Sequence, residues 1–359
     1  MSTSEAGTRV PGSRLAWMDT LRGLAVFLVI ESHAVVLGPF QRPEALLVSD
    51  YLGRPFRVPA LMFLSGMLLP RSLAKPRWTY LRGKISRILW PYLVWSVIVA
   101  AVTSFGRPAP DPLVELFVNP TSATWFVGYL FVFYVVAMFF RPVARTWLLL
   151  PVAAGIVLAA PGDALDPWAH EHALGLHRFF FCFFCFLCGD LLARHATRAL
   201  SVLMRRRTTT VCLVLALPAL VMASAGFTVR YQPLYLVCTL AGIVALIPLA
   251  SRFAGTGAGR FVAAQGRSSI VFYLVTWPVQ LVAYHVPLAL GVDDGVLATL
   301  FILCAGLAGG FAAVWLRSRV PAVDYLFDLH LERFAERRRA AARSTQTHGP
   351  GASVARSPE

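Results

Sequence analysis

The chain has 359 residues, of which 57% are hydrophobic and only 14% are charged, and its mean hydropathy is +0.64. Ordinary soluble domains are about 45–50% apolar and roughly 25% charged, so this composition excludes a soluble globular enzyme. The formal net charge of +15 does not indicate a nucleic-acid partner, because the basic residues occur in short clusters between long apolar runs. Such clusters are typical of membrane proteins.

Ten apolar runs are candidates for membrane-spanning helices, since a helix needs about 20 apolar residues to cross a hydrocarbon core of roughly 30 Å. They begin near Met18, Val58, Ile85, Thr124, Thr146, Phe179, Thr209, Leu234, Ser269 and Val296. The predicted fold is all-α, with an N-terminal tail (1–17), a ten-helix transmembrane domain (18–317) and a basic, partly disordered tail (318–359).

The second run is the shortest of the ten. From Val58 to Pro70 it reaches only about 20 Å as a helix. Either this run thins the bilayer around it, or Arg54 and Arg57, which precede it, lie in a water-filled cavity.

An even number of spans places both ends of the chain on one side of the membrane. With the N-terminus in the cytoplasm, 26 of the 33 Lys and Arg residues fall inside, six fall outside, and Arg22 lies within the first span. Cytoplasmic loops collect basic residues in this way, so both termini are predicted to be cytoplasmic in a multi-pass protein of the plasma or inner membrane. Beyond Arg317, the apolar positions Tyr325, Leu326, Leu329 and Phe334, followed by the basic residues Arg337 to Arg339, allow an interfacial amphipathic helix.

The first span contains Asp19, Arg22, Glu31 and His33, although charged groups at this depth cost about 2.5–3.5 kcal/mol each and are usually functional. Arg22 and His33 are eleven residues apart, which places them on one face of a helix and about 16 Å apart along its axis. Asp19 can pair with Arg22. Glu31 points about 180° away from Arg22, so a carboxylate that supports His33 must come from another span.

This arrangement of a cation and an imidazole suits an extended donor molecule. An arginine near the inner face can hold an anionic group through its fixed fork of donors, and a histidine deeper in the membrane can take a proton from a hydroxyl. A donor with phosphates at one end and a reactive carbonyl at the other fits the separation. In the structural alternative, Arg22 and Asp19 only anchor the helix end and His33 is a hydrogen-bonded packing residue.

Segments along the chain resemble, in order, those of the membrane acyltransferase-3 family. Met18-Asp-Thr-Leu-Arg-Gly-Leu-Ala and the Arg-X10-His spacing from Arg22 to His33 resemble the family's first span. Four later segments add to the resemblance: Pro59-Ala-Leu-Met-Phe-Leu-Ser-Gly, Lys84-Ile-Ser-Arg-Ile-Leu-Trp-Pro-Tyr, Thr124-Trp-Phe-Val-Gly-Tyr-Leu and Ser268-Ser-Ile-Val-Phe-Tyr-Leu-Val-Thr-Trp-Pro. The resemblance covers residues from about 15 to 320, implies ten spans, and looks closest to the fucose 4-O-acetylase-like branch.

The resemblance implies O-acylation, in which an acyl group, usually acetyl, moves from cytoplasmic acetyl-CoA or another acyl-CoA to a hydroxyl acceptor. His33 would be the catalytic histidine and Arg22 its partner, while Arg22, Lys84 and Arg87 would bind the donor. No metal is expected. Two departures matter: Lys84 stands where many relatives have arginine, which puts bidentate phosphate contact in doubt. Thr276-Trp277 stands where many relatives carry a histidine before the tryptophan.

Ser65, Trp125 and Tyr129 are candidates for contact with the acceptor. Trp125 and Tyr129 are four residues apart and could face a sugar, although helix packing explains them as well. Ser65 and Gly66 also suit close helix packing in lipid. The run Cys182, Cys185 and Cys188 and the loop histidines His170, His172 and His177 could suggest metal ligands, but packing on one helical stripe and a solvated loop are the favoured interpretations.

Two other classes of function remain open at this stage. A transporter or exporter of a small polar or sugar-containing molecule would also carry buried ionisable residues, but no similarity between residues 1–180 and 181–359 indicates the internal repeat common in transporters. A membrane scaffold has no need of the polar stripe in the first span. The acceptor could be a sugar, a glycan or a secondary metabolite.

Overall fold

The computed structural model describes residues 16–37, 44–103, 124–159, 167–227 and 229–331, without the side chains of 167–174. Every regular element in these ranges is a helix. The first elements are α1 (Ala16–Leu37), α2 (Glu44–Gly53), α3 (Arg57–Met67), α4 (Leu69–Leu73), α5 (Arg77–Lys84), η1 (Ile85–Leu89), α6 (Trp90–Thr103), α8 (Trp125–Phe139), α9 (Pro142–Trp147) and α10 (Leu149–Leu158). They are followed by α11 (Pro167–Arg194), α12 (Ala196–Leu203), α13 (Arg206–Ser224), η2 (Pro233–Tyr235), α14 (Leu236–Ala254), α15 (Gly257–Arg267), α16 (Ser269–Ala289), α17 (Gly295–Arg319) and α18 (Pro321–Asp324).

Seven of the described helical segments are long and apolar enough to cross a membrane. They are Ala16–Leu37, Arg77–Thr103, Gly175–Arg194, Arg206–Ser224, Pro233–Ala254, Ser269–Ala289 and Gly295–Arg319. They correspond to seven of the ten predicted runs and agree with an all-helical, multi-pass membrane protein. The other three runs form shorter helices in α3, α8 and Pro142–Leu158, so ten crossings and the orientation of the termini remain predictions.

The second predicted run forms the short helix α3, which has 11 residues, all of them buried. The helix is enclosed by protein along its whole length and does not meet lipid. A short helix at membrane depth is tolerated in such surroundings, because neighbouring helices replace the bilayer around it. Arg57 at its first position is 5% exposed, which places this arginine inside the protein.

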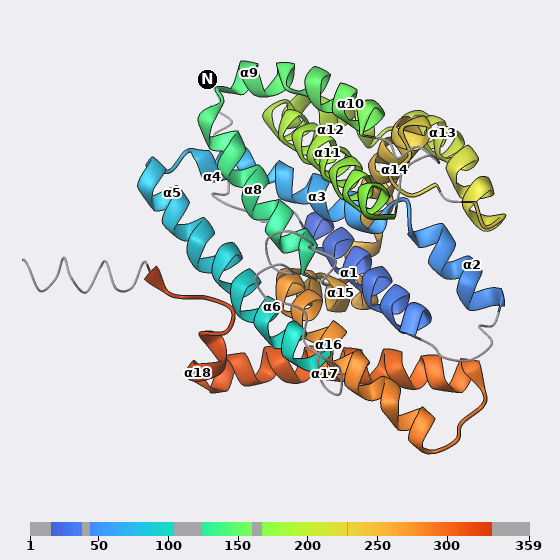
Figure 1. Ribbon diagram of the computed structural model, residues 1–359. Helices are drawn as coiled ribbons and strands as arrows, with labels where there is room; N and C mark the ends of the chain where they lie inside the picture. Colours follow the sequence, from blue (N-terminus) through green and yellow to red (C-terminus); the bar gives the residue numbers. More distant parts are fainter. Residues whose placement is uncertain (1–15, 38–43, 104–123, 160–166, 228, 332–359) are drawn as a thin grey trace, which may run out of the picture.

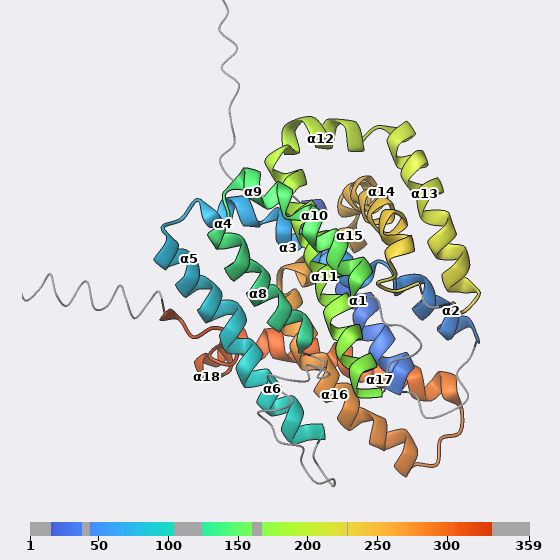
Figure 2. The same cartoon turned by 45° about the horizontal axis from the view of Figure 1, so that its top comes forward.

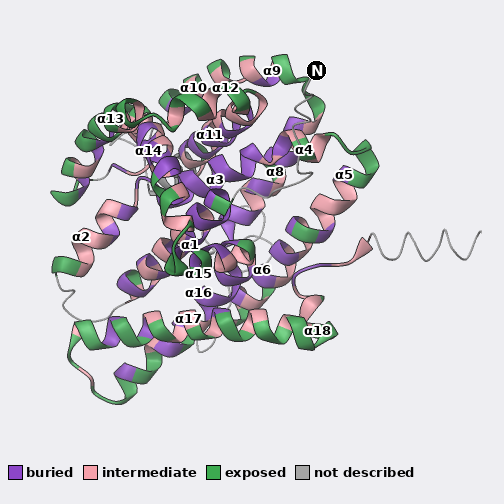
Figure 3. Ribbon diagram, turned by 180° about the vertical axis from the view of Figure 1, so that it is seen from behind, coloured by how far each residue is buried: buried purple, intermediate pink, exposed green. Residues whose placement is uncertain are grey.

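Helix α1 lies at the centre of the bundle, in contact with α3, α14, α15, α16 and α17 (Figures 1 and 2). Helices α4, α5 and α9 gather at one end of the molecule, at the upper left of Figure 2, and the turn between α16 and α17 lies at the other end. Figure 3 shows buried positions along α3 and exposed ones along α13 and α17. Exposed side chains of α13 include Val211, Leu213, Leu217 and Val221, as expected of a helix that faces lipid.

Helices α3 and α11 approach so closely that glycines are needed at their contact. A Cβ added at Gly66 would lie 1.9 Å from the carbonyl oxygen of Phe186, and one at Gly189 would lie 2.0 Å from that of Phe63. The packing interpretation of Gly66 is therefore confirmed, since a small residue is what lets the two backbones meet.

Replacing Gly66 with alanine is expected to destabilise the bundle, because the added methyl group forces α3 and α11 apart. Overpacking of this kind costs about 1–3 kcal/mol, and it would lower the apparent melting temperature of the purified protein. Gly257→Ala is the matched control, since a Cβ at Gly257 meets nothing within 4 Å. Equal melting temperatures for the two variants would contradict the packing argument.

The long helix from Arg77 to Thr103 changes its hydrogen bonding just before Pro91. Proline has no N–H to donate to the carbonyl four residues earlier, and its ring crowds that carbonyl. Residues Ile85–Leu89 form one π turn, in which the Trp90 N–H donates to the Ile85 carbonyl. The Ser86 carbonyl accepts the N–H of Leu329 at 3.2 Å. The C-terminal segment thus bonds a carbonyl that the π turn leaves without its ordinary helical donor.

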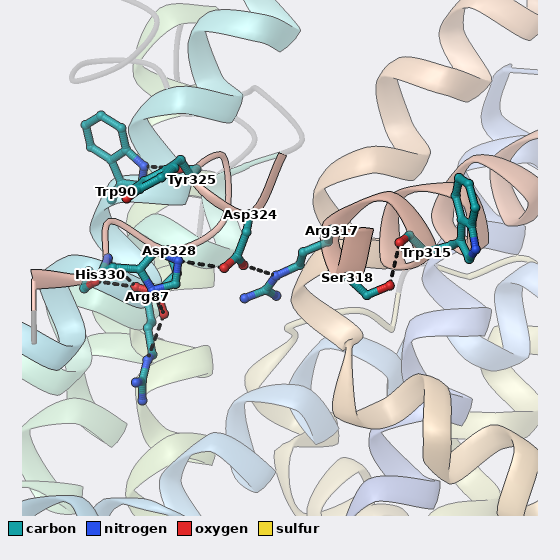
Figure 4. A network of polar contacts seen from close by, with 10 residues as sticks. Arg87, Trp90, Trp315, Arg317, Ser318, Asp324, Tyr325, Asp328 and His330 are labelled. Carbon is teal, nitrogen blue, oxygen red and sulfur yellow. Dashed lines mark hydrogen bonds and ion pairs between the residues drawn. The ribbon is translucent and has the colours of Figure 1, made fainter. Parts of the chain in front are cut away.

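Figure 4 shows how the C-terminal segment holds the beginning of α6. The Trp90 Nε1 donates to the Tyr325 carbonyl at 2.6 Å, and Asp328 accepts hydrogen bonds from Ser86 Oγ and from Arg87 Nε. Phe327 is 2% exposed and packs its ring 5.3 Å from that of Trp95. An amphipathic helix on the membrane surface is not formed over the described part of this segment, because its apolar side chain Phe327 is buried against protein.

The attachment of this segment is expected to weaken in acid through Asp328. Burial raises the pKa of the Asp328 carboxyl, but hydrogen bonds from Ser86, the His330 N–H and Arg87 lower it by more, so the pKa lies below its ordinary 3.8. A lowered folded-state pKa gives stability that is complete above the unfolded pKa and is lost as the pH falls through the folded one. Amide exchange at Leu329, corrected for its intrinsic pH dependence, should therefore accelerate only below about pH 4.

Asp328→Asn should release the segment at neutral pH, whereas Asp293→Asn, at an exposed position between α16 and α17, should not. Exchange at Leu329 that is equally slow in wild type and Asp328→Asn would contradict the role of this carboxylate.

Candidate functional site

Two pockets with basic side chains lie at the end of the molecule that carries α4, α5 and α9. A cavity of about 410 Å³ is lined by Lys75, Arg77, Arg145 and Arg194. A neighbouring cavity of about 120 Å³ is lined by Lys84 and Arg87 and shares Lys75 with the first. Several fixed cations around one hollow favour a polyanionic ligand such as a phosphate-bearing molecule. We call this region the basic end.

Tyr134 of α8 joins three of the sequence-predicted site residues near the basic end. Lys84 Nζ lies 3.3 Å from the centre of the Tyr134 ring, and the Tyr134 hydroxyl donates to the Ser65 carbonyl at 2.8 Å. The charge of Arg22 also acts on Tyr134. The structure thus brings together Arg22, Lys84 and Ser65, which lie on three different helices.

Other contacts of these residues limit what each can do. Arg22 lies 4.0 Å from Asp19, as the sequence predicted, and its side chain is 13% exposed. Ser65 Oγ donates to the Leu61 carbonyl of its own helix at 2.7 Å, so no base activates this hydroxyl here. Arg87 Nε donates to Asp328 at 3.2 Å while its side chain stays 58% exposed, which leaves Arg87 partly neutralised at the rim of the smaller pocket.

His33 lies four residues before the end of α1, on the side of the helix that faces protein. Its ring centre is 4.7 Å from that of Trp277, in an edge-to-face arrangement. The charges that act on the imidazole are those of Arg57, Arg230 and Asp50. The Nδ1 atom of His33 is buried and has no hydrogen-bond partner. Since a buried nitrogen without a partner is costly, this atom is a candidate for contact with a ligand.

Asp50 of α2 supplies the acidic charge near His33. Its carboxylate is fully buried and pairs with Arg57 at 2.6 Å and with Arg54 at 2.5 Å. Ser32, the residue before His33, also donates to it. Glu31 instead accepts a hydrogen bond from Ser49. The carboxylate near His33 is therefore not that of Glu31, as expected, but it does not come from another span, because α2 lies between the first two predicted runs.

The other face of α1 borders a different space. A cavity of about 470 Å³ is lined mainly by apolar side chains of α1 and α17, together with Glu31 and Arg57. Its residues on α1 include Leu21, Leu28 and Val35, which lie about 100–140° around the helix from Arg22. The two faces of α1 are therefore chemically distinct.

Trp125 and Tyr129 are connected to the surroundings of His33 through arginines. The Arg178 guanidinium lies 4.2 Å from the centre of the Trp125 ring and 5.6 Å from that of Tyr129. The charges of Arg178 and Arg230 both act on Cys182, and Arg230 also acts on His33. The predicted acceptor residues and the predicted base thus belong to one polar region. We call it the His33 region, and it consists of His33, Asp50, Arg57, Trp125, Tyr129, Arg178 and Arg230.

The remaining candidates lie in packing environments. Cys182 and Cys185 are buried among the phenylalanines of α11, and Cys188 is partly buried. His177 Nδ1 lies 2.8 Å from the Ile156 carbonyl of α10. The side chains of His170 and His172 lie outside the described part of the chain.

Four charged residues of the His33 region were not predicted as site residues: Asp50, Arg57, Arg178 and Arg230. Arg57, Arg178 and Arg230 are three of the six basic residues that the topology puts on the outer side. Outer loops of membrane proteins carry few Lys or Arg, so the few that are present are candidates for a functional role. Two sequence signals could have identified these four residues. One is the scarcity of basic residues on the predicted outer side, and the other is the spacing of Arg54 and Arg57 four and seven residues after Asp50.

The fold and this site define a multi-pass helical membrane protein with ionisable groups enclosed in its interior, which is the architecture of membrane enzymes and transporters. The chain belongs to the acyltransferase-3 family, because the family model, described as an acyltransferase domain, matches residues 15–316. The match establishes the family and not the fucose 4-O-acetylase-like branch. Searches of curated proteins and of solved structures found no significant match.

Proposed function

We propose that the protein is a membrane O-acyltransferase that moves an acyl group, with acetyl expected, from cytoplasmic acyl-CoA to a hydroxyl of a glycan or another small acceptor. Family membership supports acyl transfer in general. The observation that supports the particular reaction is His33, whose buried Nδ1 has no partner in an interior surrounded by charged and aromatic groups.

The donor is proposed to bind with its phosphates at the basic end. Lys75, Arg77, Lys84 and Arg87 line pockets there. Lys84 acts as a point charge and not as a bidentate clamp. From Arg22 to His33 the continuous helix α1 rises about 16 Å, a distance that the extended arm of acyl-CoA is suited to cover. The thioester would then reach the His33 region.

His33 is proposed to act as the general base. It takes the proton from the acceptor hydroxyl while the hydroxyl oxygen attacks the thioester carbonyl. The tetrahedral intermediate collapses with loss of the CoA thiolate, which recovers the proton from the imidazolium, and the acceptor leaves as an ester. Arg57 and Arg230 oppose the imidazolium but favour the oxyanion that forms at the same time, and Asp50 offsets the positive charge.

The reaction can be tested while the acceptor is still unidentified. Metabolites and glycans from cells with and without the protein are compared by mass spectrometry after feeding isotopically labelled acetate. We expect a labelled ester that is present only when the protein is produced. If the protein were instead a transporter, membrane vesicles would accumulate a solute in a protein-dependent manner and no new ester would form. That pair of results would contradict the proposal.

A further inference from the structure

Arg178 and Arg230 are two interior cations that have no acidic partner among the described residues. Both are partly buried, and the Nε atom of each is fully enclosed and makes no hydrogen bond. Among the residues that the structure describes, no carboxylate lies within salt-bridge distance of either. Buried charges are ordinarily paired, because leaving water is costly.

The other buried arginines of the described chain follow that rule. Arg57 pairs with Asp50 at 2.6 Å, and Arg145 pairs with Asp190 at 3.0 Å. Both carboxylates are fully buried, so each of these two arginines has an acidic partner beside it. The contrast marks Arg178 and Arg230 as cations whose counter-charge is not supplied by the part of the chain that the structure describes.

The two arginines are held by aromatic residues around a common point. Arg230 donates to the Tyr231 hydroxyl at 2.9 Å, and Arg178 lies over the ring of Trp125. The charges of both act on Tyr231, Tyr273 and Cys182. Arg178 and Arg230 come from different segments of the chain. Because both act on the same three residues, their guanidinium groups lie in one part of the interior.

Tyr231 adopts a backbone conformation that is costly for its residue type. Its φ angle is +64°, a left-handed value that aromatic residues rarely adopt. Tyr231 is 9% exposed, and its ring packs 5.6 Å from that of Phe181. The buried Tyr231 in turn holds the Arg230 guanidinium through the hydrogen bond to its hydroxyl.

We propose that Arg178 and Arg230 bind an anionic group of the acceptor, a carboxylate or a phosphate, and so place the acceptor hydroxyl beside His33. This inference rests on the proposed function. The donor's phosphates have their own cations at the basic end, whereas the field of Arg230 reaches His33 itself. The rings of Trp125 and Tyr129 lie against Arg178 and suit the apolar face of a sugar.

Anion binding to the purified, full-length protein tests this assignment without any acyl transfer. The apparent melting temperature is measured with methyl glucuronide, with glucose 1-phosphate and with uncharged methyl glucoside. We expect at least one anionic probe to raise the melting temperature by several degrees and the uncharged one to leave it unchanged. The two anions distinguish a carboxylate acceptor from a phosphate acceptor.

Variants assign the effect to its site. Arg178→Gln and Arg230→Gln should abolish the shift, while Lys75→Gln at the basic end and the exposed Arg260→Gln should retain it. Arg230→Gln should fold, since it removes an unpaired buried charge. His33→Ala should bind the anion as wild type does, so a failure of acyl transfer would be distinguishable. No shift with either anion, or a shift that survives in both Arg178→Gln and Arg230→Gln, would overturn the assignment.

Discussion

His33→Ala is expected to lower acyl transfer by about 10²–10⁴-fold, which is the range of a positioned general base. The reason is geometric as well as chemical. Nδ1 of His33 is enclosed without a hydrogen-bond partner among the described residues, so the side chain contributes an available basic nitrogen to the interior. The measurement is the rate of label transfer from acyl-CoA to the acceptor identified by mass spectrometry, with purified protein in lipid nanodiscs.

The variant should remain folded, because His33 makes no side-chain hydrogen bond through Nδ1 that its loss would break. Glu31→Gln is the matched control on the same turn of α1. Glu31 accepts a hydrogen bond from Ser49 and borders the apolar cavity instead of the His33 region. Glu31→Gln should keep most of the activity. A His33→Ala protein that is folded and transfers acyl groups at more than a tenth of the wild-type rate would remove His33 from the mechanism.

Asp190→Asn is expected to have the largest effect on stability. The Asp190 carboxylate pairs with Arg194, four residues later on the same helix, at 3.1 Å and with Arg145 of α9 at 3.0 Å. Asp190 is fully buried and the Arg145 side chain is 4% exposed. Removing one partner of a buried ion pair leaves an uncompensated charge, which costs about 3–5 kcal/mol. The variant should therefore be recovered in low yield and should melt well below the wild type.

Asp324→Asn provides the comparison at a more exposed position. Asp324 pairs with Arg317 at 2.7 Å, where the two side chains are 22% and 32% exposed. Ion pairs near solvent contribute about 0–1 kcal/mol, so this variant should melt close to the wild type. If Asp190→Asn and Asp324→Asn melted at the same temperature, the importance assigned to the buried carboxylate would be wrong.

The parts of the site that lie on one helix could be predicted from the sequence. Arg22 and His33 share a face of α1 because helical geometry fixes it, and both side chains do face protein. The long apolar runs were also readable, since length and composition alone determine whether a helix can cross a membrane. Helix α3 was harder to predict. It has only 11 residues, and such a short helix is stable at membrane depth only because neighbouring helices enclose it.

The parts that depend on several helices could not be predicted. Tyr134 reaches Lys84 and Ser65 only once α8 packs beside α5 and α3, and no spacing in the sequence encodes that contact. Asp50 and Arg230 reach His33 from segments about 180 residues apart. Arg178 looked like an ordinary loop charge, because it stands immediately before an apolar run. Its orientation over Trp125 is a property of the packed bundle.

The hydrogen bond from Ser86 to Asp328 joins residues that are 242 positions apart in the sequence. The hydrogen bond from the Leu329 N–H to the Ser86 carbonyl lies beside it. The helix from Arg77 to Thr103 leaves the ribosome long before its partner exists. During that interval its π turn has a carbonyl without a donor, and Ser86 and Arg87 lack their carboxylate. Since domains mature as their chain is made, this corner of the bundle is the last to close. A protein truncated before Tyr325 would be released from translation with that step permanently missing.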